Sequence, residues 1–274
     1  MQETLTIQTS ELKNLLIRTQ RLAQINGKSI AQVEGTEIEW TNGCATTCNI
    51  VRDGITSLSM FSEGCGEGKG SIVIASLSMM LGALSKHKGE VSLTQNDGKI
   101  KIVSQGKQTT VISDERAKAF THTKKTVREW AKDSGERYFG ALLQNEGKYT
   151  ASTGDVIEPC AESSCMVGEL LDALDSGSIN GQKLSQYLFH AEDGLLFVSV
   201  GAELKGRTKT LVSECDNHVK TIVGGGLENV LRTMTGSVSL KFFDLTPLGG
   251  GISLLIEQLG MKVFQREVAG VASD

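Results

Sequence analysis

The stretch 63–71 reads EGCGEGKGS and is close to a phosphate-binding loop. A Walker A loop needs a glycine, four residues and then Gly-Lys-Ser/Thr, because its backbone wraps the phosphates and its hydroxyl binds Mg²⁺. Here only three residues separate Gly64 from Gly68 and Lys69, and Gly70 replaces the hydroxyl residue. The following residues, SIVIA, predict a strand, whereas a phosphate-binding loop opens into a helix. We therefore expect a flexible glycine-rich loop between strands, and no nucleotide chemistry.

The six cysteines and four histidines lack the spacing of a metal site. Cys44 and Cys48, and Cys160 and Cys165, are spaced C-x3-C and C-x4-C, whereas zinc sites typically use C-x2-C. The histidines form no HExxH pair, and no GxSxG nucleophile motif is present. We expect reduced thiols, no metal, no cofactor and no enzymatic activity.

The composition indicates a globular protein of mildly acidic charge. The chain has 274 residues, 39% hydrophobic and 22% charged, with a net charge of -4. It has no apolar run approaching the roughly 20 residues that span a bilayer, and its first residues do not resemble a signal peptide. We expect a cytoplasmic protein with no membrane partner.

Four segments place apolar residues at i, i+3 and i+4, and three of them also at i+7. This spacing predicts short helices with one buried stripe, each starting near a residue that can cap it. The stripes are Leu12, Leu15, Leu16; Leu77, Met80, Leu81, Leu84; Val167, Leu170, Leu171, Leu174; and Leu227, Val230, Leu231, Met234. The expected caps are Thr9 or Ser10, Ser76, Ser164 and Gly226.

Strand patterns follow these helices and make the segments a repeat. Apolar and polar residues alternate, with hairpin turns predicted at Asn96, Asp97 and Gly98 and at Asp193 and Gly194. The repeated unit is therefore predicted to be one helix followed by several antiparallel strands.

The spacing of the stripes groups the four units in two pairs. The stripes begin 65 residues apart in the first pair (12 to 77), 60 apart in the second (167 to 227) and 90 apart between the pairs (77 to 167). We expect an α+β fold of two similar domains, residues 1–113 and 161–274, joined by an extended connector, residues 114–160.

This plan resembles the sliding DNA clamps of the proliferating cell nuclear antigen and T4-type phage families. The likeness covers nearly the whole chain in plan and is most specific in four segments. These are SVSLKFFDLTPL (237–248), VFQREVAG (263–270), LGALSKHKGEVSLTQNDGKIKI (81–102) and GAELKGRTKTLV (201–212). The resemblance implies two clamp domains, each of two helix-plus-antiparallel-strands units, assembling into a ring.

The resemblance also implies a function. The protein would be a DNA polymerase processivity factor, not an enzyme, that encircles duplex DNA without reading its sequence. Its partners would be the replicative DNA polymerase, a clamp loader, proteins with docking peptide motifs, and two further copies of itself, because a six-domain ring needs three two-domain chains.

The helix faces opposite the apolar stripes would line the hole and contact phosphates. The third helix departs from this pattern, because Glu169, Asp172 and Asp175 lie opposite its stripe. Cations on a helix are often only solvated. The candidate DNA contacts are Lys13, Asn14, Arg18, Arg21, Lys86, Lys88 and Arg232.

Two further surfaces follow from the resemblance. Edge strands would join neighbouring copies, although both could be internal strands of a monomer; the residues are Thr109, Thr110, Val111, Ile112, Arg207, Thr208, Lys209, Thr210 and Leu211. Peptide partners would dock in a groove formed by Pro247, Leu248, Val268 and Ala269 and the connector, where Val127, Trp130 and Ala131 have helical spacing. Trp130 or Tyr138 could anchor a partner or pack in a core.

Two alternatives stay open at this point. A checkpoint-type clamp subunit or a monomeric processivity factor would keep the fold without the homotrimer, and a proline at Val111 should break only the trimer. A viral structural protein of repeated β-domains would stimulate no polymerase.

Overall fold

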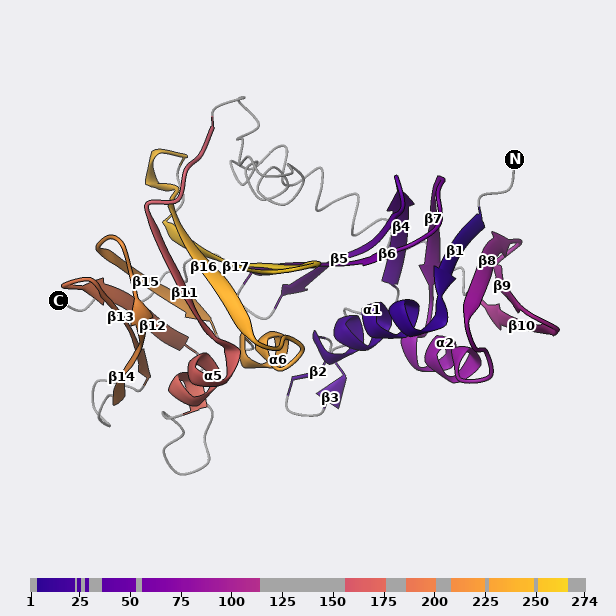
Figure 1. Cartoon of the computed structure of the whole chain (residues 1–274), viewed down its shortest axis with the longest axis horizontal. Helices are drawn as coiled ribbons and strands as arrows, with labels where there is room; N and C mark the ends of the chain where they lie inside the picture. Colours follow the sequence, from indigo (N-terminus) through magenta and orange to yellow (C-terminus); the bar gives the residue numbers. More distant parts are fainter. Residues whose placement is uncertain are drawn as a thin grey trace. The chain divides into compact units, whose positions relative to one another are not determined.

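The computed structural model describes residues 4–22, 24–25, 28–29, 36–52, 56–113, 156–175, 186–200, 208–224, 227–248 and 251–265 (Figure 1). Residue contacts divide the chain into two compact units. The first contains Met1–Val51 and Ser59–Glu129, and the second contains Arg52–Leu58 and Trp130–Asp274. Most of the predicted connector, including Val127, Trp130 and Tyr138, lies outside the described residues. The predicted domain bounds therefore stay predictions.

In the first unit, two helices pack against antiparallel strands. Strands β1, β8, β9 and β10 form one sheet in that order, and β6, β5, β4 and β7 are neighbours in the other. The elements are β1 (Thr4–Gln8), α1 (Thr9–Leu22), β2 (Gln24–Ile25), β3 (Lys28–Ser29), β4 (Thr36–Thr41), β5 (Cys44–Arg52), β6 (Thr56–Gly64), β7 (Lys69–Ile74), α2 (Leu77–Leu84), β8 (Glu90–Asn96), β9 (Lys99–Ser104) and β10 (Lys107–Ile112).

The second unit repeats this plan. Strands β14, β13, β12 and β15 form one sheet, and β11, β16, β17 and β18 are neighbours in the other. The elements are β11 (Ala161–Met166), α5 (Val167–Asp175), β12 (Gln186–Glu192), β13 (Leu195–Val200), β14 (Thr208–Glu214), β15 (Val219–Gly224), α6 (Leu227–Leu231), β16 (Ser237–Asp244), the 3-10 turn η2 (Thr246–Leu248), β17 (Ile252–Gln258) and β18 (Met261–Gln265).

The repeat is larger than the sequence predicts, because a strand precedes each helix. That strand pairs with the other half of its own unit: β1 pairs with β8, β7 with β4, β11 with β16 and β15 with β12. Each half of a unit thus contributes one strand to the sheet of the other half, and these strands join the two halves. Each leading strand has only 5 or 6 residues. Strands β1 and β11 run directly into their helices, and β7 and β15 end a short distance before theirs.

The apolar stripes of the helices form much of the core, with one shift from the prediction. Leu12, Leu15 and Leu16 are fully buried, as predicted. In α2 and α5, however, Ala83 and Ala173 are buried, while the predicted Leu81 and Leu171 are only half-buried. The predicted stripe in α6 is buried throughout.

The hairpin turns follow the sequence closely. Asp97 and Gly98 have φ of 47° and 70°, and Asp193 and Gly194 have 52° and 80°. Two residues with positive φ match the twist of the flanking strands, which is why Asp-Gly occurs there. A third turn, Asn42-Gly43, joins β4 to β5 in the same way and was not predicted, although its dipeptide is an equally strong hairpin signal.

The helix starts follow the sequence only in part. Ser76 caps α2 as predicted, accepting a bond from the Met79 N–H at 3.3 Å. The prediction for α5 is wrong, because Ser164 lies inside β11; the Glu169 carboxylate instead accepts the Met166 N–H at 3.3 Å. Gly226 lies outside the described residues.

The stretch EGCGEGKGS runs from the end of strand β6 to the start of strand β7, and residues 65–68 form the loop between them. The predicted connection between strands is confirmed, and no helix follows it directly. Two backbone bonds fix it: the Cys65 N–H donates to Gly43 at 2.8 Å, and the Gly66 N–H donates to Thr6 at 2.6 Å. A Cβ at Gly66 would lie 3.2 Å from the Thr6 Cβ. A side chain at this position would require Thr6 to shift, so glycine allows the two segments to approach closely.

Candidate nucleic-acid interface and assembly edges

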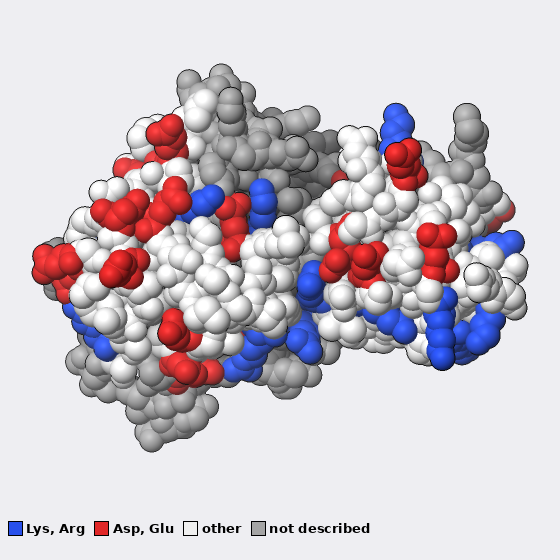
Figure 2. Space-filling model, in the orientation of Figure 1, with Lys and Arg blue, Asp and Glu red and all other residues white. Residues whose placement is uncertain are grey.

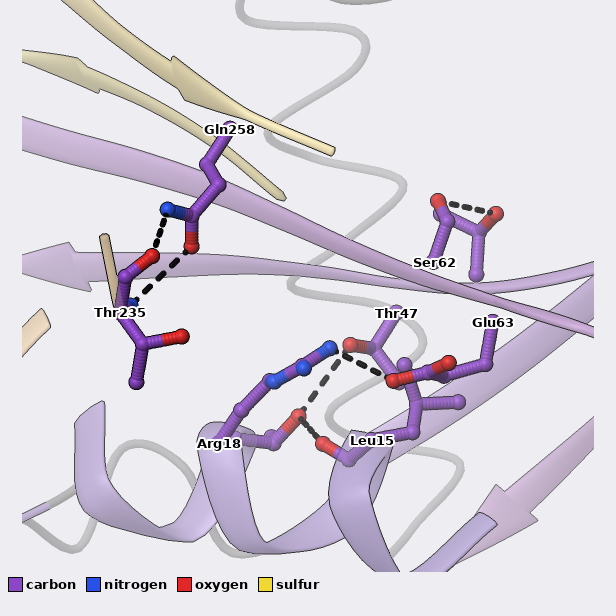
Figure 3. A network of polar contacts seen from close by, with 9 residues as sticks. Leu15, Arg18, Thr47, Ser62, Glu63, Thr235 and Gln258 are labelled. Carbon is purple, nitrogen blue, oxygen red and sulfur yellow. Dashed lines mark hydrogen bonds and ion pairs between the residues drawn. The ribbon is translucent and has the colours of Figure 1, made fainter. Parts of the chain in front are cut away.

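Helix α1 presents part of its predicted polar face to solvent. Asn14 and Arg21 are exposed, and Lys13 is half-buried. The Arg18 guanidinium donates to Glu63 Oε1 at 2.6 Å, with 22% and 19% of the two side chains exposed (Figure 3). Arg18 therefore braces α1 against β6, and its charge is already shared with a carboxylate.

Further hydroxyl contacts attach α1 to the strands behind it. The Thr19 hydroxyl donates to the Leu15 carbonyl at 2.9 Å and lies 3.1 Å from Thr47 Oγ1 in β5 (Figure 3). Thr46 and Ser62 join β5 to β6 through hydroxyls 3.0 Å apart. The exposed residues of α1 thus project from a helix with polar as well as apolar anchors.

Positive charge also gathers where α2 ends. Lys86 and Lys88 are both exposed, and the Lys107 ammonium donates to the Lys86 carbonyl at 3.2 Å. Cations are favourable at a helix C-terminus because its free carbonyls carry partial negative charge. In Figure 2, Lys and Arg gather along the edge of the first unit on which Figure 1 places α1 and α2.

His87 lies between these lysines but points into the protein. Its side chain is buried, with Nδ1 2.7 Å from Ser104 Oγ and Nε2 2.9 Å from Thr109 Oγ1. Burial lowers the pKa of His87 below its usual value, and the nearby Lys107, Lys13 and Lys86 lower it further. The imidazole thus joins α2 to strands β9 and β10 in its neutral form.

The protein should consequently lose stability in mild acid. Between the lowered folded pKa and the unfolded value of 6.5, the unfolded chain binds more protons. The contribution of His87 is thus complete above pH 6.5 and decreases below it, by at most about 1.4 kcal/mol per pH unit. Urea unfolding at pH 7.5 and 5.5 measures this difference.

The matched variant is His87→Asn, which cannot titrate. It should show a smaller loss of stability between pH 7.5 and 5.5 than the parent protein. Some loss should remain, because burial, followed by Lys209, also lowers the pKa of His190. An equal loss in the parent and the variant would contradict this account of His87.

The acidic face of α5 is partly neutralised within its own unit. Arg232, after α6, donates to Asp175 Oδ2 at 3.3 Å, and Glu169 accepts the Met166 N–H. Sequence spacing cannot reveal the Arg232 pair, since 57 residues separate its members. Arg232, a predicted DNA contact, therefore lies beside a carboxylate, and Asp172 is exposed.

A buried polar pair joins α6 to strand β12. The Tyr187 hydroxyl donates to Glu228 Oε2 at 2.9 Å, and only 4% of Glu228 is exposed. After the helix, the Gln258 amide donates to the carbonyl of Thr235 (Figure 3). It also donates to the carbonyl of Ser237 at 2.9 Å. These bonds fix the segment that contains Arg232, although nothing in the local sequence indicates them.

Both predicted assembly strands lie at the edge of a sheet. Among the described strands, β10 pairs only with β9, and β14 pairs along its length only with β13. Each edge exposes a large apolar side chain: Ile112 is 65% exposed and Leu211 is 54% exposed. The predicted residue Arg207 lies outside the described residues.

One predicted assembly residue has contacts within its own unit. The Lys209 ammonium pairs with Glu192 and lies 4.0 Å from the centre of the Phe197 ring. The Phe197 ring also stacks on His190, with ring centres 5.5 Å apart. Lys209 is therefore held along the sheet face next to the edge.

The predicted partner groove is described only at Pro247. This residue is exposed in η2, where Asp244 Oδ1 accepts the Thr246 N–H at 2.9 Å. Bonds to Thr246 lower the pKa of the Asp244 carboxyl below its usual value. The Leu248 side chain and all of Val268, Ala269 and Trp130 lie outside the described residues, so the groove stays a prediction.

The described residues also bear on two other kinds of site. They contain no cluster of three or more His, Cys, Asp or Glu side chains that could hold a metal ion. None of the described helices is both long enough and apolar enough to cross a membrane.

Comparison with solved structures supplies the remaining observation. The fold matches DNA polymerase III subunit beta from Pseudomonas aeruginosa with a TM-score of 0.64 at 15% identity, covering 96% of this chain and 65% of that one. The chain has the fold of a DNA polymerase sliding clamp. The Helicobacter pylori beta clamp matches this chain with the same TM-score of 0.64, at 14% identity over 99% of this chain and 66% of that one.

The Bacillus subtilis sliding clamp matches with a TM-score of 0.63 at 13% identity, covering 98% of this chain and 65% of that one. The chain thus has the clamp fold over nearly its whole length but spans less than two thirds of the length of these bacterial clamps. No protein-family model and no curated protein sequence matches it. The comparison of structures therefore confirms the predicted α+β clamp fold, although the sequence identity to these clamps is only 13% to 15%.

Proposed function

We propose that the chain is a sliding clamp that encircles duplex DNA and tethers replication proteins to it. The observation that supports this most is the clamp fold over 96% to 99% of the chain. The exposed cations of α1 and at the end of α2 add to it, since DNA is held without sequence preference through its phosphates. The proposed role is that of a scaffold with no catalytic step, acting in the cell interior.

The proposed partners follow from this role. They are duplex DNA, the replicative DNA polymerase, a clamp loader, proteins with docking peptides and other copies of the chain. A ring of six domains would need three copies of a two-domain chain. The exposed edges β10 and β14 are the proposed contact between copies, because unpaired strand edges readily pair with another chain.

The decisive experiment compares closed circular DNA with the same DNA made linear. Subunits are dissociated by dilution and then concentrated with either DNA, so that rings can assemble around it without a loader. We expect the protein to stay with circular DNA through gel filtration at high salt and to slide off linear DNA. Equal loss from both DNAs would contradict encirclement and favour a monomeric factor that binds by charge alone.

A further inference from the structure

The backbone of β10 alternates between groups bonded to β9 and groups that point out of the sheet. The Ser113 N–H donates to the Gly98 carbonyl at 2.5 Å, next to the last paired residue of the strand. Since an antiparallel ladder bonds every second residue, Val111 also bonds β9. The N–H and C=O groups of Thr110 and Ile112 therefore point outward from the edge.

The turn between β12 and β13 sets the same alternation on β14. The two-residue turn after Glu192 makes that residue and Leu195 a bonded pair. Odd-numbered residues of β13 thus bond β12, and even-numbered ones bond β14. Thr210, opposite Val198, is therefore bonded to β13.

The outward groups of β14 are limited to a short regular stretch. With Thr210 bonded inward, the backbone groups of Lys209 and Leu211 point away from β13. The register between the two strands then shifts between Leu196 and Phe197. A bulge there changes the phase of the ladder, so the regular edge ends at Leu211.

Only two antiparallel alignments bring both outward residues of β14 against outward residues of β10. One places Thr110 opposite Leu211 and Ile112 opposite Lys209. The other is shifted by two residues, with Gln108 opposite Leu211 and Thr110 opposite Lys209. Odd shifts are excluded because they set outward groups against inward ones and turn the side chains to opposite faces.

The side chains favour the first alignment. It makes Ile112 and Leu211, which are 65% and 54% exposed, diagonal neighbours on one face of the joined sheet. It also places Lys107 near Glu214, which has the opposite charge. The shifted alignment places Ile112 beyond Thr208, the first residue of β14, and separates it from Leu211.

We propose that β10 of one copy pairs antiparallel with β14 of a second copy in this single register, with Thr110 opposite Leu211 and Ile112 opposite Lys209. The inference rests on the proposed ring and specifies the residues of its contact. Four backbone bonds join the two strands, and Ile112 packs against Leu211 across them. The bulge after Leu211 prevents the strands from sliding further.

Pairs of introduced cysteines test the register by disulfide formation between copies. Directly opposite residues have Cα atoms about 5.5 Å apart, within disulfide range, whereas diagonal neighbours are about 7–8 Å apart and beyond it. We expect Thr110→Cys with Leu211→Cys to give at least about tenfold more covalent dimer and trimer on mild oxidation than either diagonal pair. The diagonal pairs are Gln108→Cys with Leu211→Cys and Ile112→Cys with Leu211→Cys.

A second pair keeps the Leu211 side chain, which all three of these variants lose. Ile112→Cys with Lys209→Cys should also crosslink, and each single variant controls for native thiols such as the exposed Cys44. Assembly with crosslinking through Gln108 or through the Ile112 and Leu211 pair overturns the register and leaves the ring intact. A protein that stays monomeric and crosslinks at no pair overturns both the register and the proposed ring.

Discussion

Thr110→Pro should convert the assembled protein to monomers and abolish its retention on circular DNA. Proline removes an N–H that points out of β10 and adds a ring where the second copy would approach. One lost hydrogen bond alone costs about 0.5–1.5 kcal/mol, which weakens a contact by about 2- to 12-fold. Because the proline ring also blocks the approach of the second copy, we expect each contact to weaken about tenfold or more. Three such contacts close a ring, so the loss of rings should be steeper still. Sedimentation at micromolar concentration measures the oligomeric mass directly.

The matched control is Thr110→Val, which keeps the N–H and the β-branched shape. It should assemble as the parent does, and both variants should unfold at similar urea concentrations. A proline at Val111 is a poorer test, because the Val111 N–H belongs to the ladder with β9 and its loss would damage the unit itself. If Thr110→Pro still forms rings of the parent mass, β10 is not the contact.

Reversing the charge of Lys86 and Lys88 together should weaken the hold on DNA without changing assembly. Both side chains are exposed and follow α2, so Glu at each position replaces attraction to phosphate with repulsion. Losing two phosphate contacts should reduce the slope of log affinity against log salt by about 2, and affinity at low salt by about tenfold to hundredfold. Fluorescence anisotropy with duplex DNA over a salt series measures both quantities.

Lys99 and Lys101 provide the control with the same change in net charge. They are exposed on β9, on the sheet face opposite the buried Ile100 and Ile102. Replacing both with Glu should leave the salt slope nearly unchanged. Equal effects of the two double variants would mean that DNA responds only to net charge and that α2 has no special role.

Arg18 shows where sequence geometry is insufficient for a binding site. Its helical position correctly places it away from the apolar stripe, and this made it a candidate phosphate contact. The structure adds Glu63 at 2.6 Å, a residue 45 positions away near the end of strand β6, where the stretch that looks like a nucleotide motif begins. A charge pair of this kind depends on how β6 packs beside α1, which no local pattern records.

The acidic third helix, α5, also shows that sequence geometry is insufficient, here for residues that the pattern makes unfavourable for DNA binding. Glu169, Asp172 and Asp175 appear unsuited to a DNA-facing helix when α5 is considered alone. Two of them have partners in the structure: Glu169 accepts the Met166 N–H, and Asp175 pairs with Arg232. The first is a local interaction that the spacing to the helix start could have indicated, whereas the second required the packing of α5 beside α6.

The sequence by itself indicated the four helices, the Asp-Gly hairpins and the helix-plus-strands repeat, and its resemblance to sliding clamps implied the α+β clamp fold. The helices, hairpins and repeat depend on residues close together in the chain: apolar side chains at helical spacing, alternation along strands and turn residues that accept positive φ. The tertiary structure alone decided the exchange of leading strands, the ion pairs of Arg18 and Arg232, and the outward phase of β10 and β14. The strand exchange and the ion pairs arise from contacts between segments that are distant in the chain. The outward phase of β10 and β14 arises from the register of each ladder, and a shift of one residue would reverse it without altering any local pattern.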